Sequence, residues 1–291
     1  MVAHSQRKWF FGLLFTSLQA LLGYSEEANM LTRSDLIMIE RSDIDQLHDR
    51  FVQYPELINA TSYREGSCTG LGYAASLGHF EVVATLIHLQ SNVEARCHEE
   101  SLTPLMLAVI CSLQHEVNHN LCPAHLASEV PVHDDHAKAA RIILTDGRAS
   151  VSASDAKGRQ AIHLAAMNGN LNILRDLLNK GADPNARDSY GWTPIFYAVQ
   201  RDDHECIVQL ARGGALVDAK DDMGYSPLMH AVHLGHIKSI RGLRRHHAKC
   251  AFDVLELIYD KLNEQSDPLA HKRLMKALGP HCMPTNYHDE L

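Results

Sequence analysis

A segment near the middle of the chain carries histidines at the spacing of a zinc site. It runs His115-Glu-Val-Asn-His119, and Cys122 and His125 follow a few residues later. On a helix, residues four positions apart share one face, so His115 and His119 could hold zinc while Glu116 acts as a general base. Cys122 and His125 add two more side chains of ligand type. This spacing is typical of a zinc-binding or metal-dependent hydrolase segment.

The same segment resembles the metzincin signature, HExxHxxGxxH, but differs from it where the metzincin chain reverses. The glycine at that point is replaced by Cys122. A protease also needs a cleft, which one short loop cannot build. Histidine is abundant here, with 20 of 291 residues, so the spacing arises easily by chance. We therefore predict a non-enzymatic protein without a cofactor, and a zinc site at His115, His119, Cys122 and His125 stays open as the alternative.

Charge and cysteine content exclude several other classes of protein. The formal net charge is −8, whereas a nucleic-acid-binding protein needs a basic stripe to neutralise phosphates. The short basic run over residues 241–247 is interpreted as the end of a solvated helix. The seven cysteines contain no CxxC pair, which argues against a zinc ribbon or a thioredoxin-type motif. In an oxidising compartment some cysteines can pair, and at least one is left over.

The N-terminal residues have the layout of a secretory signal. A short basic start precedes an apolar stretch over residues 9–23, and Gly23 and Ser25 are small residues where a signal peptidase prefers them. A bilayer span needs about 20 apolar residues, so this stretch is too short to anchor the chain. We expect a signal peptide over residues 1–25 and no membrane span in the mature chain. The alternative is an amphipathic helix packed on the rest of the protein.

The last four residues, His288, Asp289, Glu290 and Leu291, form an HDEL sequence. A recycling receptor reads such a signal and returns escaped lumenal proteins to the endoplasmic reticulum. The residues before it contain two prolines and no helical period, so 280–291 are predicted to be a flexible tail. The two ends together predict a protein of the endoplasmic reticulum lumen that binds the HDEL-recycling receptor.

The middle of the chain repeats itself. Thr69, Thr103, Gln160, Thr193 and Ser226 occupy equivalent places, at intervals of 34, 57, 33 and 33 residues. The long interval indicates that the repeat beginning at Thr103 carries an insertion, at about residues 113–133 and between its two helices. Thr and Pro favour the start of a helix, because a hydroxyl can accept from orphan amides and proline lacks the amide that would be orphaned.

These units resemble the ankyrin repeat, a β-turn followed by two helices in about 33 residues. The resemblance covers residues 64 to about 249. It implies an all-α ankyrin-repeat solenoid of about five helix-pair repeats with β-turn fingers, whose stacked units share one core. The segments that carry it are residues 188–195 and 221–228, and more divergent copies at 69–75, 102–108 and 155–166.

Glycines mark the expected turns within this solenoid. Gly78, Gly169 and Gly235 lie between the two helices of a repeat, where the chain must turn with a positive φ. Gly147 and Gly181 are predicted to end second helices in the same way.

A solenoid also needs a cap at each end, predicted here over residues 26–63 and 250–279. In the N-terminal cap, Ile44, Leu47 and Phe51 lie at helical spacing and predict a buried face. The C-terminal cap is predicted to contain helices over residues 252–262 and 268–278.

Two kinds of site follow from this interpretation. Asn59 begins a glycosylation sequon in a predicted surface turn, which matters if the chain enters the secretory pathway; an unmodified turn asparagine is the alternative.

The second site is for a partner protein. Ankyrin proteins bind partners with their turn tips and the inner face of their first helices. By register, Tyr190, Trp192, Met223 and Tyr225 lie at exposed tips, and Tyr197 points along the inner face. Aromatic residues and methionine are enriched at interface hot spots. The alternative is that some of these rings stack between adjacent turns as structure.

Overall fold

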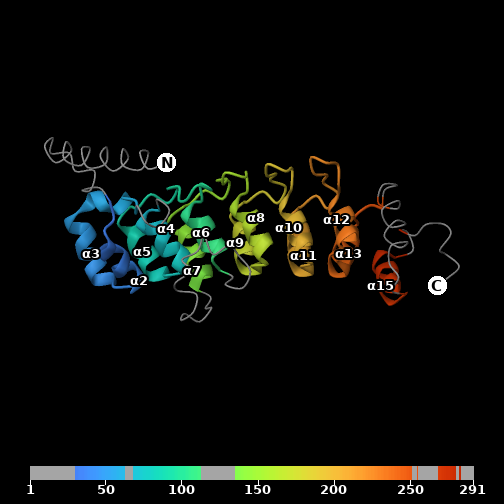
Figure 1. The fold of residues 1–291 in the computed structure, drawn as a ribbon, viewed down its shortest axis with the longest axis horizontal. Helices are drawn as coiled ribbons and strands as arrows, with labels where there is room; N and C mark the ends of the chain where they lie inside the picture. The colour runs from blue at the N-terminus through green and yellow to red at the C-terminus, as the bar shows by residue number, and fades with distance from the viewer. Residues whose placement is uncertain are drawn as a thin grey trace, which may run out of the picture.

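A computed structural model describes residues 30–62, 68–112, 135–250, 254, 268–279 and 282. Within these ranges the chain forms helices in antiparallel pairs, and the pairs stack into an elongated solenoid (Figure 1). The described part contains no strand, only isolated β-bridges in the turns. The helices are α2 (Arg33–Glu40), α3 (Ile44–Gln53), η2 (Pro55–Asn59), α4 (Gly70–Leu77), α5 (Phe80–His88), α6 (Pro104–Ile110), α7 (Asp135–Thr145), α8 (Ala161–Asn168), α9 (Leu171–Asn179), α10 (Pro194–Gln200), α11 (His204–Arg212), α12 (Pro227–Leu234), α13 (Ile237–Arg245) and α15 (Pro268–Leu278).

The first helix of each repeat begins where the repeat pattern predicts. The five N-caps are Thr69, Thr103, Gln160, Thr193 and Ser226. The hydroxyls of Thr69, Thr103 and Ser226 each accept an amide of the first turn at 3.3 Å, as the composition of these caps predicts. Thr193 differs, because its buried Oγ1 has no hydrogen-bond partner. Its helix begins instead with Pro194, which lacks an amide hydrogen.

Two rows of helices carry the core. The first helices α4, α6, α8, α10 and α12 pack on one another in sequence, and so do the second helices α5, α7, α9, α11 and α13. Small residues let the rows approach closely: Ala74, Ala75, Ala165 and Ala166 are completely buried. Because each helix is covered by its neighbours in the stack, apolar burial continues along the whole described solenoid.

The turns between paired helices confirm three of the predicted glycines. Gly78, Gly169 and Gly235 have φ of 74°, 69° and 72°, a region that residues with a Cβ rarely adopt. The prediction for Gly147 is wrong. The left-handed residue after α7 is Arg148, with φ of 54°. Gly147 instead lies close to the preceding turn, where an added Cβ would approach the Ile143 carbonyl oxygen at 2.7 Å.

The predicted N-terminal cap is a helix pair with the same stacking as a repeat. Its first helix α2 packs on α4, and its second helix α3 packs on α5. A capping box at Thr32 and Asp35 begins α2. Leu47 and Phe51 are fully buried and Ile44 is half-buried, as their spacing predicts. The described solenoid therefore contains six stacked helix pairs, the first of which lacks the sequence pattern of the others.

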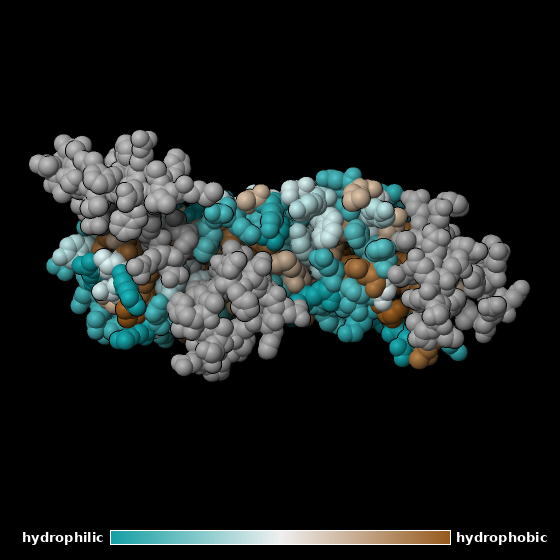
Figure 2. All heavy atoms as spheres, in the orientation of Figure 1, coloured by the Kyte–Doolittle hydropathy of each residue, from teal (hydrophilic) through white to brown (hydrophobic). Residues whose placement is uncertain are grey.

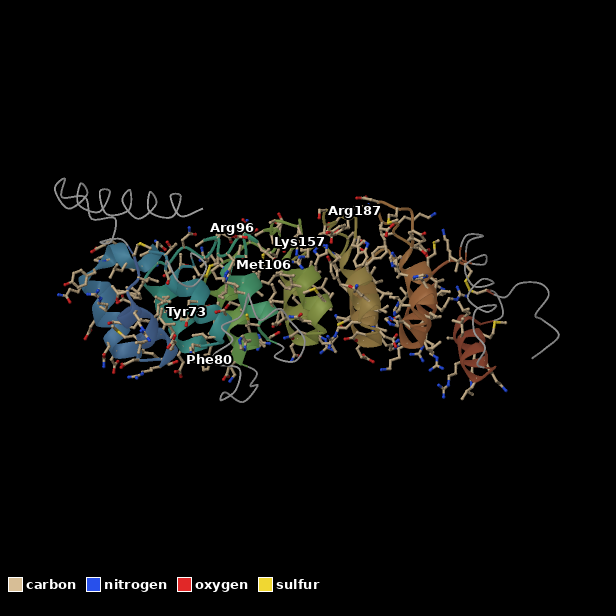
Figure 3. The ribbon with its side chains drawn as sticks, in the orientation of Figure 1. Tyr73, Phe80, Arg96, Met106, Lys157 and Arg187 are labelled. Carbon is tan, nitrogen blue, oxygen red and sulfur yellow. A yellow bond between two sulfur atoms is a disulfide. The ribbon has the colours of Figure 1, made fainter. Side chains whose placement is uncertain are left out.

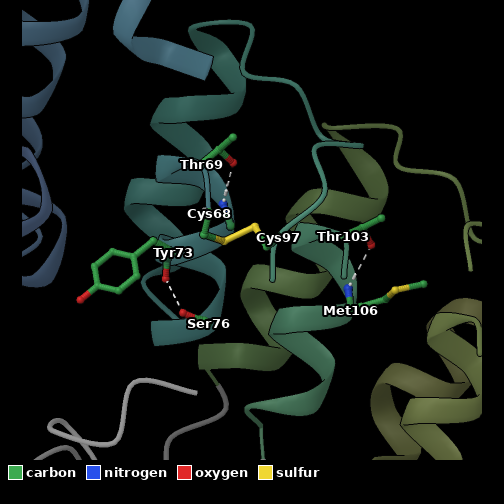
Figure 4. The surroundings of a disulfide bond; sticks show 8 residues. Cys68, Thr69, Tyr73, Ser76, Cys97, Thr103 and Met106 are labelled. Atoms are coloured by element: carbon green, nitrogen blue, oxygen red, sulfur yellow. Dashed lines mark hydrogen bonds between the residues drawn. A yellow bond between two sulfur atoms is a disulfide. The ribbon is translucent and has the colours of Figure 1, made fainter. Parts of the chain in front are cut away.

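A disulfide joins the first two recognisable repeats (Figure 4). Cys68 precedes the N-cap of α4, and Cys97 lies in the turn before α6, with 4.4 Å between their Cα atoms. Gly72 on α4 lies against this bond, because a Cβ there would overlap both sulfur atoms. The glycine in the weakest copy of the repeat pattern is thus explained by the disulfide that it accommodates.

The C-terminal end is held in a similar way. Helix α15, predicted from the sequence, packs on α13, and Arg244 donates from Nε to the Leu278 carbonyl oxygen at 3.1 Å. A second disulfide joins Cys250 to Cys282. Cys282 is completely buried, so the predicted flexible tail over residues 280–291 begins too early. The other helix of this cap, predicted over residues 252–262, lies outside the described residues except for position 254.

The insertion falls between α6 and α7, as the repeat interval predicts. The next repeat stabilises the end of α6. Asn168 on α8 donates its amide group to the carbonyl oxygens of Val109 and Ile110 at 2.7 and 3.1 Å. Asn170 donates to the Ser112 hydroxyl at 3.2 Å. The candidate zinc ligands His115, His119, Cys122 and His125 all lie outside the described residues.

Candidate functional site

The turns between helix pairs form projecting fingers, each organised by a buried aspartate. We use the name for residues 155–159, 188–192 and 221–225. In each finger the aspartate Oδ1 accepts the amides two and four positions later, at 2.8–3.0 Å. Asp155, Asp188 and Asp221 are spaced 33 residues apart and are 6–8% exposed. A buried carboxylate with two fixed amides gives each finger a rigid backbone.

The other carboxylate oxygen has a different partner in each finger. Oδ2 of Asp155 accepts from Nε of Arg159 at 2.8 Å, and that of Asp188 accepts from the Tyr197 hydroxyl at 2.6 Å. Oδ2 of Asp221 lies 3.1 Å from Nε2 of His230. The same scaffold therefore places a cation, a phenol or an imidazole behind successive fingers.

Neighbouring fingers are also linked through their backbones. The amide of Ser189 donates to the Lys157 carbonyl oxygen at 2.9 Å, and that of Asp222 to the Tyr190 carbonyl oxygen at 3.3 Å. Arg187 adds a side-chain link, because Nη1 donates to the Lys220 carbonyl oxygen at 2.7 Å. Figure 3 shows Lys157 and Arg187 along the same edge of the solenoid. The fingers consequently form one continuous edge with fixed spacing.

Chemical character changes along this edge. The first finger forms an ionic cluster with the preceding turn, in which Arg159 and Lys157 pair with Glu100 at 3.2 and 3.3 Å. Further along, Tyr190, Met223 and Tyr225 are 61, 80 and 40% exposed. We call these three residues the finger patch. Figure 2 shows pale and tan residues at the finger edge above α10 and α12, beside teal neighbours. The three tip positions of the finger patch are exposed, as the repeat register predicts.

Trp192 is not an exposed tip, in contrast to the prediction. It is half-buried, its indole N–H donates to Oδ2 of Asp221 at 3.3 Å, and its ring stacks on Phe196 at 5.7 Å between centroids. Tyr197 and His230 contact it edge-on, both with centroids at 5.4 Å. Register gives the position of a residue within its repeat, whereas the neighbouring finger decides whether the ring is covered. Trp192 is thus part of the packing between fingers.

Tyr197 differs from its prediction in the same sense. Only 7% of it is exposed, and its hydroxyl is bound to Asp188. Burial raises the pKa of the Tyr197 hydroxyl well above its ordinary value, and the hydrogen bond to the Asp188 carboxylate raises it further. A neutral, buried phenol with a fixed acceptor is a structural group, so Tyr197 supports the finger instead of offering a contact on the inner face.

His163 shows a further supporting role, on the first helix of its repeat. Its Nδ1 accepts the Gln160 amide at 3.0 Å, while Nε2 lies 2.9 Å from the Ala186 carbonyl oxygen. Burial lowers the pKa of this imidazole. A neutral ring with its proton on Nε2 satisfies both partners, and it ties the start of α8 to the approach of the next finger.

The described residues contain no group of three or more His, Cys, Asp or Glu side chains that could hold a metal ion. In the same part of the chain, no helix has the length and apolar character needed to cross a membrane. Asn59 is exposed at the end of η2, where its Oδ1 accepts the Asn92 amide at 2.7 Å. N-glycosylation modifies Nδ2, so this hydrogen bond and a glycan on Asn59 are compatible.

Sequence reasoning did not identify the buried aspartates as the residues that fix the finger patch. A signal was available, since Asp155, Asp188 and Asp221 recur with the period of the repeat. The second signal is that a glycine, Gly191 or Gly224, follows three positions later at a positive φ. Aspartate and glycine at this spacing are typical of a turn in which the carboxylate accepts the amides ahead of it.

Comparison with known proteins identifies the class to which this architecture belongs. The model of a family described as "Ankyrin repeats (3 copies)" matches residues 110–188 and 162–253. The solved structure of an ankyrin repeat domain from Acinetobacter baumannii aligns with a TM-score of 0.59 over 74% of this chain and 98% of that one. Its sequence identity is 20%, so this likeness concerns the fold. No curated protein matches the chain in sequence.

The described helix pairs therefore have the fold of an ankyrin-repeat solenoid, and residues 110–253 match the ankyrin-repeat family model. Ankyrin repeats are typically non-enzymatic modules for protein–protein interaction. A fold hosts many unrelated functions, however, and the partner must be argued from the exposed residues.

Proposed function

We propose that this protein is an interaction scaffold of the endoplasmic reticulum lumen, and that the finger patch binds its partner protein. One observation carries the proposal. Tyr190, Met223 and Tyr225 are exposed, yet the amide of each is bound to a buried aspartate. Large side chains on a rigid backbone lose little conformational entropy on binding, which favours their use as anchors.

Truncation of the finger patch tests this part of the proposal. A Tyr190→Ala/Met223→Ala variant should capture crosslinked partner about thirtyfold less efficiently, which corresponds to about 2 kcal/mol for a hot spot. The matched control is Leu216→Ala, because Leu216 is 63% exposed but lies outside the fingers. The Tyr190→Ala/Met223→Ala variant should have the melting temperature of the wild type, since neither side chain packs in the core. Equal capture by the two variants would place the binding surface elsewhere.

The location rests on a second set of observations. A signal-like sequence over residues 1–25 and the HDEL sequence at residues 288–291 support a lumenal protein, although both lie outside the described residues. The paired cysteines 68–97 and 250–282 support it independently, because disulfides persist in oxidising compartments and are rare in the cytosol. In this compartment the HDEL-recycling receptor is the second partner that we infer.

Protease protection tests the location. Tagged protein should resist protease in sealed microsomes and become sensitive when detergent opens them. Deletion of Leu291 should release the protein into the medium, because the retention signal is read at its end. Recovery of the untruncated N-terminus from the cytosol would contradict the proposal.

Glycosylation at Asn59 gives a separate readout. A lumenal chain should carry one glycan at this sequon that endoglycosidase removes, and Asn59→Gln should abolish the mobility shift. An Asn92→Gln variant is the control, because Asn92 is also exposed in a turn but lacks the sequon.

The zinc alternative is tested by measuring the zinc content of the purified protein. Stoichiometric zinc would favour that alternative.

A further inference from the structure

The C-terminal end of the solenoid carries a concentration of positive charge. Helix α13 contains Lys238, Arg241, Arg244 and Arg245, and helix α15 contains Lys272, Arg273 and Lys276, while neither helix contains Asp or Glu. These two helices pack directly on each other. Seven of the 27 lysines and arginines thus lie on two adjacent helices of a chain whose net charge is −8.

Six of these residues are exposed, and we call them the basic edge: Lys238, Arg241, Arg245, Lys272, Arg273 and Lys276. On α13 the exposed cations stand at positions i, i+3 and i+7, which form one face of a helix. Elsewhere in the solenoid, arginines such as Arg141 and Arg187 pair with aspartates of the next repeat at 2.9 and 2.8 Å. Among the described residues, none of the six makes such an ion pair.

Folding alone does not account for this charge. Cations at the end of a helix offset its dipole, which explains Arg245 in the last turn of α13 and Lys276 in that of α15. Lys238 lies near the start of α13, where a cation opposes the dipole, and Arg241 lies in the middle. Like charges on successive turns also repel one another. The carboxylate of Asp202 accepts from Ser239 near the start of α13, at 2.8 and 2.9 Å, and an anionic partner would interact favourably with the exposed cations further along.

The groups next to the end of α13 include further cations. Burial lowers the pKa of His246, which follows α13, and the nearby cations Arg212 and Arg245 lower it further, together with His204 and His247. Among the described residues, the groups around the end of α13 are therefore mostly cationic.

We propose that the basic edge is a docking site for an acidic segment of a partner polypeptide, separate from the finger patch. Cations on α13 recur about every helical turn, roughly 5 Å, which matches carboxylates on successive turns of an acidic helix. Arg241, Arg245 and Arg273 can each bind a carboxylate through two parallel N–H groups. The finger patch lies on the opposite edge of the solenoid from α15 (Figure 1), so both surfaces can be occupied together.

A membrane surface fits this distribution of charge less well. The row of second helices that contains α13 also contains α3 and α5, which expose Asp45, Asp49 and Glu81. A planar anionic bilayer would meet those carboxylates when it approached the row. A polypeptide segment can follow α13 and α15 alone. Of the large apolar residues on α13 and α15 whose exposure the structure describes, Leu269 is the exposed one, at 55%.

Charge reversal tests the proposal on the full chain. The probe is a fluorescently labelled oligo-glutamate peptide, measured by anisotropy at low ionic strength. Arg241→Glu/Arg273→Glu should weaken binding about tenfold, and salt should weaken wild-type binding in the same way. The matched control is Arg175→Glu/Lys180→Glu, which makes the same change in net charge at two exposed positions, one within α9 and one at its C-cap. It should bind within about twofold of wild type.

Two results would overturn the proposal. Equal losses in both charge-reversed pairs would mean that the peptide senses only net charge. Binding of phosphatidylserine vesicles that exceeds peptide binding, and that is lost in Arg241→Glu/Arg273→Glu, would assign the edge to lipid headgroups. The Tyr190→Ala/Met223→Ala variant should bind the peptide like wild type, so failure of the finger-patch proposal is distinguishable from failure of this one.

Discussion

The indole of Trp192 and the carboxylate of Asp221 join two consecutive fingers, with 3.3 Å between Nε1 and Oδ2. The same carboxylate oxygen accepts from His230, whose ring contacts Trp192 edge-on. Asp221 therefore links the backbone of its own finger to the aromatic packing of the finger before it. Several consequences for stability can be measured.

Truncation of Trp192 should destabilise the solenoid. Trp192→Ala removes stacking on Phe196 and the bond to Asp221, and we expect a loss of about 2–3 kcal/mol in the free energy of unfolding. Trp192→Phe keeps most of the ring packing and should cost about 1 kcal/mol. Tyr190→Ala, on the neighbouring exposed tip, is the control and should change the urea midpoint little. Similar midpoints for all three variants would show that Trp192 does not join the fingers.

The Asp221 carboxylate should make the solenoid sensitive to acid. Burial opposes its ionisation, but hydrogen bonds from His230 and from the amides of Tyr225 and Met223 outweigh burial, and the pKa of Asp221 falls below the ordinary 3.8. A lowered folded-state pKa contributes stability above the ordinary value, which is lost as the pH falls through the folded-state value.

Urea unfolding of wild type and Asp221→Asn, followed from about pH 6 to about pH 2, measures this contribution. The difference in stability should be largest near neutral pH and shrink below about pH 4. Asp222→Asn is the matched control, because Asp222 is exposed and pairs only with Arg187 at the surface. A constant difference between wild type and Asp221→Asn would contradict the assignment.

His163 should remain neutral at pH values somewhat below the ordinary imidazole pKa of 6.5, because burial lowers its pKa, and its proton should be on Nε2. Burial lowers this pKa, so the stability that the neutral ring contributes is present above 6.5 and lost as the pH falls through the lower folded value. Nitrogen-detected NMR of the ring reports the tautomer directly. His163→Ala should cost about 2 kcal/mol, because two backbone groups lose their partner. A proton found on Nδ1 would exclude the bond from Gln160 as described.

The disulfide between Cys68 and Cys97 should stabilise the first repeats. Its loop is 29 residues in sequence separation, and closing a loop of that length is worth about 3 kcal/mol. The variant Cys68→Ala/Cys97→Ala should lose this amount. Cys206→Ala is the control, because Cys206 is buried and free, and its thiol has a pKa raised by burial.

Gly72 provides a sharper version of this test. Gly72→Ala should destabilise the wild type, because its Cβ would overlap the two sulfur atoms. In the chain without this disulfide, the same substitution should be neutral or slightly stabilising, since alanine favours a helix by about 1 kcal/mol over glycine. Equal effects in both backgrounds would mean that Gly72 has another role.

The fold could be predicted from the repeat period because the repeated positions are the N-caps at which the first helices begin. Thr69 and Ser226 lie at N-caps for the same reason, a hydroxyl facing the free amides of a first turn. The first helix pair was not identified as a repeat because Thr32 is followed by Arg33 and Ser34 in place of the usual pattern. The structure identifies this pair as part of the stack because α2 packs on α4. A contact of this kind between helices cannot be recognised from the sequence pattern of one repeat.

The exposure of the candidate binding residues was predicted less completely. The repeat register depends on one repeat, whereas burial depends on the contact between two. Tyr190 and Trp192 stand two residues apart on one finger, and only the next finger determines that Trp192 is covered and Tyr190 is not. The pairing of the cysteines could not be predicted from the sequence for the same reason. Cys68 and Cys97 meet only because two repeats stack.

The amide of Asn168 has a practical consequence for protein engineering. Because it closes the end of α6 from the following repeat, the carbonyl oxygens of Val109 and Ile110 have hydrogen-bond partners on α8. Loop length adds little closure entropy. The interval between α6 and α7 is therefore a position at which insertion of an epitope, a fluorescent reporter or a second binding domain can be tested, provided that the disulfide-bonded Cys111 at the end of α6 keeps its partner.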